Sequence, residues 1–183
     1  MIDMKTSNST HTVHAGARRE KSNHAITEPI VQSSTYTFED TRDLCDFMDA
    51  ATLGKTDGRV EYGRYGNPTV AAAENRLAAL EGASDCVLCS SGMAATTITL
   101  LALLSVGTHV VITDDSYRRT REFCRTFLKR FGVPCSVVPA GDYDALESAI
   151  QPKTKLLVSE SPTNPYLRCL DLERFADIGR RHK

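Results

Sequence analysis

The sequence holds one uncharged run of small and apolar residues, Cys89-Ser90-Ser91-Gly92-Met93-Ala94-Ala95-Thr96-Thr97-Ile98-Thr99-Leu100-Leu101-Ala102-Leu103-Leu104. A short apolar run, Cys86-Val87-Leu88-Cys89, leads into the turn. The small residues 90–92 then form a turn, and the remainder continues without a charge for the length of a helix. This order predicts a buried strand over 85–89, a tight turn, and a buried helix over 92–105.

The predicted turn has the chemistry of an anion-binding site. Gly92 lets the backbone approach a ligand closely, and Ser90 and Ser91 offer hydroxyl groups. The N–H groups of the first helical turn have no intrahelical acceptor and point along the positive end of the helix dipole. The dipole contributes only about 0.3–2 kcal/mol, so further hydrogen bonds and nearby cations must hold a phosphate. A helix of the core that is merely capped by serine is the alternative interpretation of the turn alone.

The chain downstream of this turn alternates between apolar and amphipathic segments. Near-continuous apolar runs separated by helices are typical of a mostly parallel sheet with helices on both faces. Ligands of such sheets bind beyond the carboxyl ends of the strands, where the loops 90–93, 114–117 and 160–165 are expected to converge. The predicted elements are strands 109–113, 135–138 and 155–159, a helix 117–131 closed by Gly132, a helix 142–150 capped by Asp142, and a helix that follows Asp171.

The segment upstream is less regular. Residues 1–35 show no sustained periodicity, residues 39–52 are weakly helical, and residues 53–58 are rich in turn formers. Asn67 is a suitable N-cap, with Pro68 as the first helical residue, for a helix that ends at Gly82. We therefore expect an irregular arm and connector over 1–60, packing on a neighbouring subunit, and an α/β domain over 61–183. The tripeptide 54–56, Gly-Lys-Thr, lacks the upstream glycine that a P-loop requires.

The composition excludes several function classes. The 183 residues are 41% hydrophobic and 25% charged, with a formal net charge of −1, which favours a folded domain without general attraction to nucleic acid or to acidic membranes. Because no run is apolar enough to cross a bilayer and the first 20 residues are polar, we expect a cytoplasmic protein. The six cysteines are expected to be reduced and buried. Cys86 and Cys89 are assigned to the core rather than to a metal, so no metal site is predicted.

Several short motifs occur together in a characteristic order. They are Tyr62-Gly63-Arg64-Tyr65-Gly66-Asn67-Pro68-Thr69, Leu80-Glu81-Gly82, Ser91-Gly92-Met93-Ala94, Asp115-Ser116-Tyr117 and Glu160-Ser161-Pro162-Thr163-Asn164-Pro165. In this order the chain resembles the Cys/Met-metabolism family of pyridoxal-phosphate enzymes, from about Ile30 onwards. The segments 117–121 and 166–171 look most like the cystathionine gamma-synthases of that family, particularly the plant type.

The resemblance implies a fold and a set of site residues. It implies the N-terminal part of a fold-type I large domain that binds pyridoxal 5'-phosphate. The backbone N–H groups of Gly92 and Met93 would hold the cofactor phosphate. Tyr117 would stack on the pyridine ring and take part in proton transfer, and Asn164 would hydrogen-bond the phenolic oxygen of the ring. Tyr62 and Arg64 match the pair that reaches the phosphate of a neighbouring subunit.

Without the family, each of these residues has a simpler interpretation. Tyr62 and Arg64 would belong to a surface turn, Tyr117 would anchor a core, and Asn164 would start an Asn-Pro turn. Arg121 is a possible contact to a substrate carboxylate, although a solvated arginine is the stronger interpretation. The charged residues of helix 117–131 are expected to form a solvated or subunit-facing surface.

The resemblance also implies residues that the sequence lacks. The family's Schiff-base lysine and the aspartate that faces the pyridine nitrogen belong to segments beyond residue 183, and no lysine of this chain lies in a matching context. The chain alone is therefore expected not to turn over. The implied reaction of the whole enzyme is γ-replacement of an activated homoserine ester by cysteine, which gives cystathionine for methionine biosynthesis.

Two other functions stay open at this point. One is a cystathionine or methionine lyase of the same family, and the other is a non-catalytic partner subunit. In every case the expected partners are small amino-acid substrates and further copies of the subunit, as a dimer or tetramer with shared active sites. A generic nucleotide-binding fold is disfavoured, because no Gly-x-Gly-x-x-Gly follows the first strand.

Overall fold

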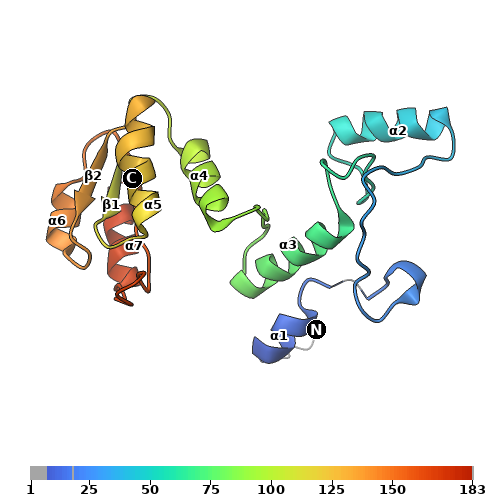
Figure 1. The fold of residues 1–183 in the computed structure, drawn as a ribbon, viewed down its shortest axis with the longest axis horizontal. Helices are drawn as coiled ribbons and strands as arrows, with labels where there is room; N and C mark the ends of the chain where they lie inside the picture. The colour runs from blue at the N-terminus through green and yellow to red at the C-terminus, as the bar shows by residue number, and fades with distance from the viewer. Residues whose placement is uncertain (1–7, 18, 183) are drawn as a thin grey trace. The chain divides into compact units, whose positions relative to one another are not determined.

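The computed structural model describes residues 8–17 and 19–182 (Figure 1). The chain divides into two compact units, Met1–Leu88 and Cys89–Lys183. The second unit contains a parallel three-stranded sheet and helices, which confirms the predicted α/β class.

The sheet of the second unit is built around one buried strand. β1 (His109–Thr113) lies between β2 (Cys135–Val138) and β3 (Thr154–Val158), and it runs parallel to both. All five residues of β1 are buried. This explains why β1 is an almost continuous apolar run, because a central parallel strand faces helices on both sides.

Helices cover both faces of this sheet, as the sequence predicted. Val110 and Ile112 pack with residues of α4 (Gly92–Leu103) and of the π-helical segment η2 (Phe123–Leu128), which continues α5 (Arg118–Glu122). Val111 points to the other face and packs with α6 (Tyr143–Ser148) and α7 (Leu172–Arg181). The period-two alternation along β1 therefore assigns its side chains to two separate core clusters.

The predicted caps are confirmed in the backbone geometry. A side-chain oxygen of each of four residues accepts a hydrogen bond from an amide of the first helical turn: Asn67 in α3 (Pro68–Glu81), Ser91 in α4, Asp142 in α6 and Asp171 in α7. Gly82 ends α3 with φ +63° and Gly132 follows η2 with φ +73°. Both glycines adopt the left-handed conformation that other residues enter only at a steric cost.

His109 begins β1 and joins all three strands. Its side chain is buried, with Nδ1 2.8 Å from Thr154 Oγ1 on β3 and Nε2 3.0 Å from Ser136 Oγ on β2. The two hydroxyl groups serve both ring nitrogens of a neutral imidazole. Burial lowers the pKa of His109 below its ordinary value, because the charged form loses its hydration.

The strand predicted over residues 85–89 is wrong. The structure has no strand over this segment, and carboxylates accept hydrogen bonds from two of its amides: Leu88 N–H donates to Glu74 Oε1 at 2.8 Å, and Cys86 N–H donates to Asp85 Oδ1 at 2.8 Å. Val87 is 77% exposed. An apolar run predicts only that a segment can be buried, whereas a strand also needs a neighbouring strand to pair with.

The expected burial of α4 and of the cysteines is also largely wrong. Within α4 only Leu100 is buried, while Ile98, Leu101 and Leu103 are exposed. One face of this uniformly apolar helix packs on the sheet, and the sheet cannot cover the opposite face as well. The cysteines are free thiols as expected, but only Cys124 is buried among the six.

The first unit contains short helices and an extended arm. Its helices are α1 (Asn8–His14), η1 (Ser22–His24), α2 (Thr41–Thr52) and α3. The arm runs along the loop 61–69, where Thr35 and Tyr62 form an antiparallel bridge and Asn67 Nδ2 donates to Val31 O at 3.0 Å. Arg59 lies 5.1 Å from the Phe38 ring and forms two hydrogen bonds of 2.9 Å with Asp43 of α2.

None of the helices in the described ranges combines the length and the apolar character that a membrane span requires.

Candidate functional site

The amino end of α4 presents backbone amides at the turn that the sequence singled out. Ser91 Oγ accepts a hydrogen bond from the N–H of Ala94 at 3.1 Å, which satisfies one amide of the first turn. The N–H groups of Gly92 and Met93 precede it, where helix geometry provides no intrahelical acceptor. A Cβ built on Gly92 would meet no atom within 4 Å, so open space adjoins this backbone.

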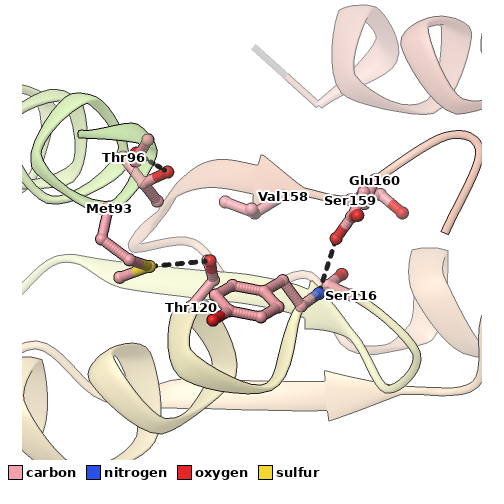
Figure 2. Close-up of a pocket in the computed structure, with 9 residues that line it drawn as sticks. Met93, Thr96, Ser116, Thr120, Val158, Ser159 and Glu160 are labelled. Atoms are coloured by element: carbon pink, nitrogen blue, oxygen red, sulfur yellow. Dashed lines mark hydrogen bonds between the residues drawn. The ribbon is translucent and has the colours of Figure 1, made fainter. Parts of the chain in front are cut away.

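A cavity of about 400 Å³ lies at this turn (Figure 2). Its lining comes from the start of α4, the loop before α5, and the carboxyl end of β3, so the three loops expected to converge each contribute. The lining residues are Gly92, Met93, Thr96, Ser116, Tyr117, Thr120, Val158, Ser159 and Glu160. Figure 2 shows the Met93 sulfur facing the Thr120 hydroxyl, which donates to it at 3.7 Å.

Tyr117 lies at the entry to α5 and is fixed through its backbone. Its N–H donates to Glu160 Oε2 at 2.6 Å, and its side chain is partly exposed beside the cavity. The bond joins the loop after β1 to the loop after β3. A carboxylate at the start of a helix also stabilises the positive end of the helix dipole.

Three hydroxyl groups join the carboxyl ends of the same two strands. Thr113 Oγ1 is 2.7 Å from Ser116 Oγ and 2.7 Å from Ser159 Oγ. Thr113 and Ser116 are buried. A buried and satisfied hydrogen-bond network of this kind orders the backbone that surrounds it, and here it orders the loop that leads to Tyr117.

Gly92, Met93 and Tyr117 thus lie around one cavity, whereas two other predicted residues do not line it. Asn164 is an exposed residue of the loop that follows β3. Arg121 lines a separate hollow of about 540 Å³ with Arg118 and other residues of α5 and η2. Arg121 Nε donates to Ser116 O at 2.9 Å, so part of its guanidinium is used within the loop before α5.

Tyr62 and Arg64 belong to the first unit and form an aromatic cluster there. The Arg64 guanidinium carbon is 5.1 Å from the centre of the Tyr62 ring and 5.3 Å from that of Tyr65. Both rings and Arg64 are solvent-accessible in the described part of the chain. The two rings orient the guanidinium, one nitrogen of which donates to Tyr65 OH at 3.5 Å, and its other N–H groups can bind an anion.

Sequence reasoning missed four of the lining residues, Thr96, Thr120, Val158 and Ser159, whereas Ser116 and Glu160 lie in loops that it had assigned to the site. Ser159 could have been found, because it follows β3 at the carboxyl end of the sheet, where ligands bind. Thr96 lies about one turn inside α4, and Thr120 is the third residue of α5. No sequence signal separates such threonines from ordinary helix residues.

The lining suits a phosphate ester that carries an aromatic ring, as pyridoxal 5'-phosphate does. Amides at a helix start bind phosphate, hydroxyl groups add donors, and the Tyr117 ring is an apolar surface for a second ring. Within the described residues no lysine or arginine lines the cavity, and Glu160 contributes a carboxylate. The negative charge of a phosphate there must be balanced by a cation from outside the lining.

Comparison with known proteins agrees with these features. The Cys/Met metabolism PLP-dependent enzyme family matches residues 9–183. The chain is 43% identical over 176 residues to cystathionine gamma-synthase 1, chloroplastic, of Arabidopsis thaliana, covering 94% of this chain and 30% of that protein. It is 39% identical over 170 residues to cystathionine gamma-synthase of Mycobacterium tuberculosis, covering 93% of this chain and 41% of that protein.

Solved structures show the same relationship in three dimensions. The crystal structure of metB from Corynebacterium glutamicum matches with a TM-score of 0.83 and 33% identity, covering 97% of this chain and 43% of the other. Cystathionine gamma-lyase from Lactobacillus plantarum, complexed with L-serine, matches with a TM-score of 0.80 and 31% identity, again over 97% of this chain and 42% of the other. The chain spans less than half the length of these relatives. The chain belongs to the Cys/Met metabolism PLP-dependent enzyme family.

Proposed function

We propose that this chain forms the phosphate-binding part of a pyridoxal-phosphate site in an enzyme resembling cystathionine gamma-synthase. The reaction of the whole enzyme is γ-replacement, in which the thiol of cysteine displaces the ester group of an activated homoserine. One observation carries the proposal: the amides of Gly92 and Met93 and the ring of Tyr117 adjoin the same cavity in a chain of this family.

Each of these groups has a defined task in the proposed site. The amides bind the phosphate, and Tyr117 holds the ring of the cofactor and can exchange a proton through its phenol oxygen. When bound, the cofactor supplies an electron sink for the reacting amino acid. Asn164 completes the set as a hydrogen-bond donor to the ring once the loop 160–170 is correctly placed.

The missing cation is assigned to Arg64. The cavity lining has no positive side chain among the described residues, whereas Arg64 is exposed and oriented by two tyrosine rings. We therefore propose that the active enzyme is an oligomer in which Tyr62 and Arg64 of one subunit approach the phosphate bound by another. An exposed, stacked guanidinium matches the geometry of a phosphate better than an ammonium group would.

We expect this chain to bind the cofactor without catalysing the reaction. No lysine lines the cavity in the described residues, so binding here is noncovalent. The probe is pyridoxine 5'-phosphate, which lacks the aldehyde that would react with any exposed lysine. We expect saturable binding that excess inorganic phosphate weakens and pyridoxine does not. Equal competition by pyridoxine would refute a site that is built on the phosphate.

The reaction class is tested by product analysis with the protein that contains this chain. Activated homoserine esters and cysteine are supplied together with pyridoxal phosphate, and the products are identified by mass spectrometry. Cystathionine supports the synthase. Ammonia and an oxo-acid without cystathionine would instead identify a lyase, a class to which the similar Lactobacillus plantarum protein belongs.

A second candidate function follows from the exposed cluster of Tyr62, Arg64 and Tyr65. In this alternative the chain is a non-catalytic partner that assembles with a complete subunit and lends it Arg64. The chain is mixed with a full-length cystathionine gamma-synthase whose own matching arginine is replaced. Activity that recovers with the natural chain and fails with Arg64→Ala supports this alternative, and no recovery with either chain rejects it.

A further inference from the structure

Asp115 is a buried carboxylate that lies directly before Ser116 and Tyr117. Its side chain is 5% exposed, and both carboxylate oxygens are enclosed. Neither oxygen accepts a hydrogen bond from any residue in the described ranges. Buried carboxylates normally accept several hydrogen bonds, so an unsatisfied one requires an explanation.

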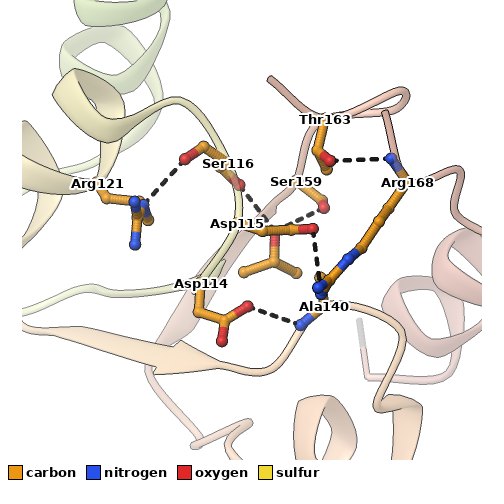
Figure 3. A network of polar contacts seen from close by, with 9 residues as sticks. Asp114, Asp115, Ser116, Arg121, Ala140, Ser159, Thr163 and Arg168 are labelled. Atoms are coloured by element: carbon orange, nitrogen blue, oxygen red, sulfur yellow. Dashed lines mark hydrogen bonds and ion pairs between the residues drawn. The ribbon is translucent and has the colours of Figure 1, made fainter. Parts of the chain in front are cut away.

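The charge that faces Asp115 comes from the loop after β3. Arg168 Nη1 lies 3.8 Å from Asp115 Oδ2, close enough for an ion pair but too far for a hydrogen bond (Figure 3). The Arg168 side chain is 62% exposed, and its guanidinium also lies 5.4 Å from the centre of the Tyr166 ring. One partner is therefore held in the protein interior, and the other reaches it from the surface.

The backbone of Arg168 closes the loop that carries Asn164. Arg168 N–H donates to Thr163 Oγ1 at 3.1 Å, and Thr163 N–H donates to Arg168 O at 3.0 Å. Leu167 N–H donates to Thr163 O at 2.8 Å, and the Thr163 side chain is buried. Residues 164–167 thus form a small closed turn whose base is held by Thr163 and Arg168.

The ion pair joins this turn to the loop that carries Tyr117. The turn is closed internally, and its tie to the loop after β1 is made at Arg168. Two hydrogen bonds hold the start of the loop after β3 to the loop after β1. Ser159 bonds to Thr113, and Glu160 bonds to Tyr117. We propose that Asp115 and Arg168 are a positioning pair that sets Asn164 relative to Tyr117, an inference that rests on the proposed function.

An electrostatic tie explains why the carboxylate is left without hydrogen bonds. A hydrogen-bonded Asp115 would be satisfied by its own loop and would have no need of Arg168. An unsatisfied carboxylate attracts the guanidinium more strongly, because the low dielectric of its surroundings screens it little. Since Arg168 stays mostly exposed, Arg168→Gln loses little packing, and the double variant, which also removes the charge of Asp115, separates loss of the tie from the cost of a buried charge left without a partner.

The test replaces each partner and measures the loop directly. The variants are Asp115→Asn, Arg168→Gln and the double variant, and the matched control is Asp144→Asn. Asp144 forms an ion pair of similar length, 3.6 Å, with Arg174, but both side chains of that pair are exposed. Amide hydrogen exchange at Thr163, Leu167 and Arg168 is compared with the affinity for pyridoxine 5'-phosphate.

We expect Arg168→Gln to increase exchange at these amides at least tenfold and to weaken binding of the probe about tenfold, with Asp144→Asn changing neither. The double variant should be no worse than the poorer single variant, as expected for one shared interaction. Unchanged exchange in a folded Arg168→Gln chain would overturn the proposal, even if Asp115→Asn fails to fold. If the natural chain does not bind the probe, the proposed function fails, and the exchange measurement still decides whether the pair positions the loop.

Discussion

Replacement of Gly92 by aspartate tests the phosphate site with opposite effects on stability and on binding. A Cβ at Gly92 meets no atom within 4 Å, so the backbone accepts a side chain there without a clash. Gly92 is the first residue of α4. A carboxylate in the first turn stabilises a helix by about 0.3–1 kcal/mol through the dipole, so we expect Gly92→Asp to fold at least as stably as the natural chain.

The same carboxylate should oppose a bound phosphate strongly. Two like unit charges about 4 Å apart repel by about 4 kcal/mol at an effective dielectric constant of about 20. The cavity is open to solvent and salt, which reduce this value. We expect the affinity for pyridoxine 5'-phosphate to fall about 100-fold, equivalent to about 2.7 kcal/mol. This repulsion exceeds the gain from the dipole, so the two measurements should move in opposite directions.

Gly92→Ala is the matched control, because it adds the same Cβ without the charge. Alanine is the better helix former by about 0.5–1 kcal/mol and keeps the backbone N–H that binds the ligand. Urea denaturation gives the stability, and equilibrium dialysis at a fixed, low salt concentration gives the affinity. If Gly92→Asp and Gly92→Ala both bind as tightly as the natural chain, no anion lies at this turn and the proposed site is refuted. Equal losses in both variants would instead show a steric effect.

Three further predictions concern the folded chain. Burial lowers the pKa of His109, so as the pH falls the unfolded state binds the proton before the folded state does. The contribution of His109 to the free energy of unfolding should therefore be constant above about pH 6.5. Below that pH the free energy of unfolding should fall by at most about 1.4 kcal/mol per pH unit. Urea titrations at several pH values check this, and His109→Gln should reduce the dependence. Leu128→Ala should lower the free energy of unfolding by about 2–5 kcal/mol, because Leu128 is 1% exposed. Leu101 of α4 is 50% exposed, so Leu101→Ala should cost less than half as much. Equal costs would contradict the described core. By sedimentation velocity the chain alone should be a dimer or larger, since β2 and β3 each present an unpaired edge in the described sheet, and a clean monomer would contradict this.

Local chemistry made most of the second unit predictable. Caps at Ser91, Asp142 and Asp171 and the left-handed Gly132 mark helix ends through interactions within a few residues. Such signals depend little on the remainder of the fold. The apolar run of β1 likewise predicts a strand buried on both faces. The loops that follow parallel strands converge for geometric reasons, which is why Gly92 and Tyr117 could be assigned to one site before the structure was known.

Features that depend on distant contacts were not predictable. The amides of Cys86 and Leu88 donate to carboxylates, that of Leu88 to Glu74 on α3, and the sequence does not encode this choice locally. The π-helical winding of residues 123–128 departs from the α-helix predicted over 117–131. The unsatisfied carboxylate of Asp115 is likewise invisible to pattern analysis, since acidic residues are usually exposed.

The charge of the site bears on the proposal that two subunits share one phosphate. A phosphate held by two backbone amides gains about 1.5–3 kcal/mol from each charge-assisted hydrogen bond, and about 0.3–2 kcal/mol from the helix dipole. These sum to about 3–8 kcal/mol, and the loss of translational and rotational freedom subtracts at least about 4 kcal/mol, so these interactions alone give a dissociation constant no tighter than about millimolar. Enzymes retain such cofactors far more tightly, and Glu160 in the lining adds repulsion rather than attraction. No positive side chain of the described lining attracts the phosphate, so a guanidinium such as that of Arg64 would have to reach it from outside this lining. The proposed sharing of the phosphate between subunits would supply this interaction, and on that proposal Arg64→Ala should weaken phosphate binding in an assembled protein while leaving that of a dissociated chain unchanged.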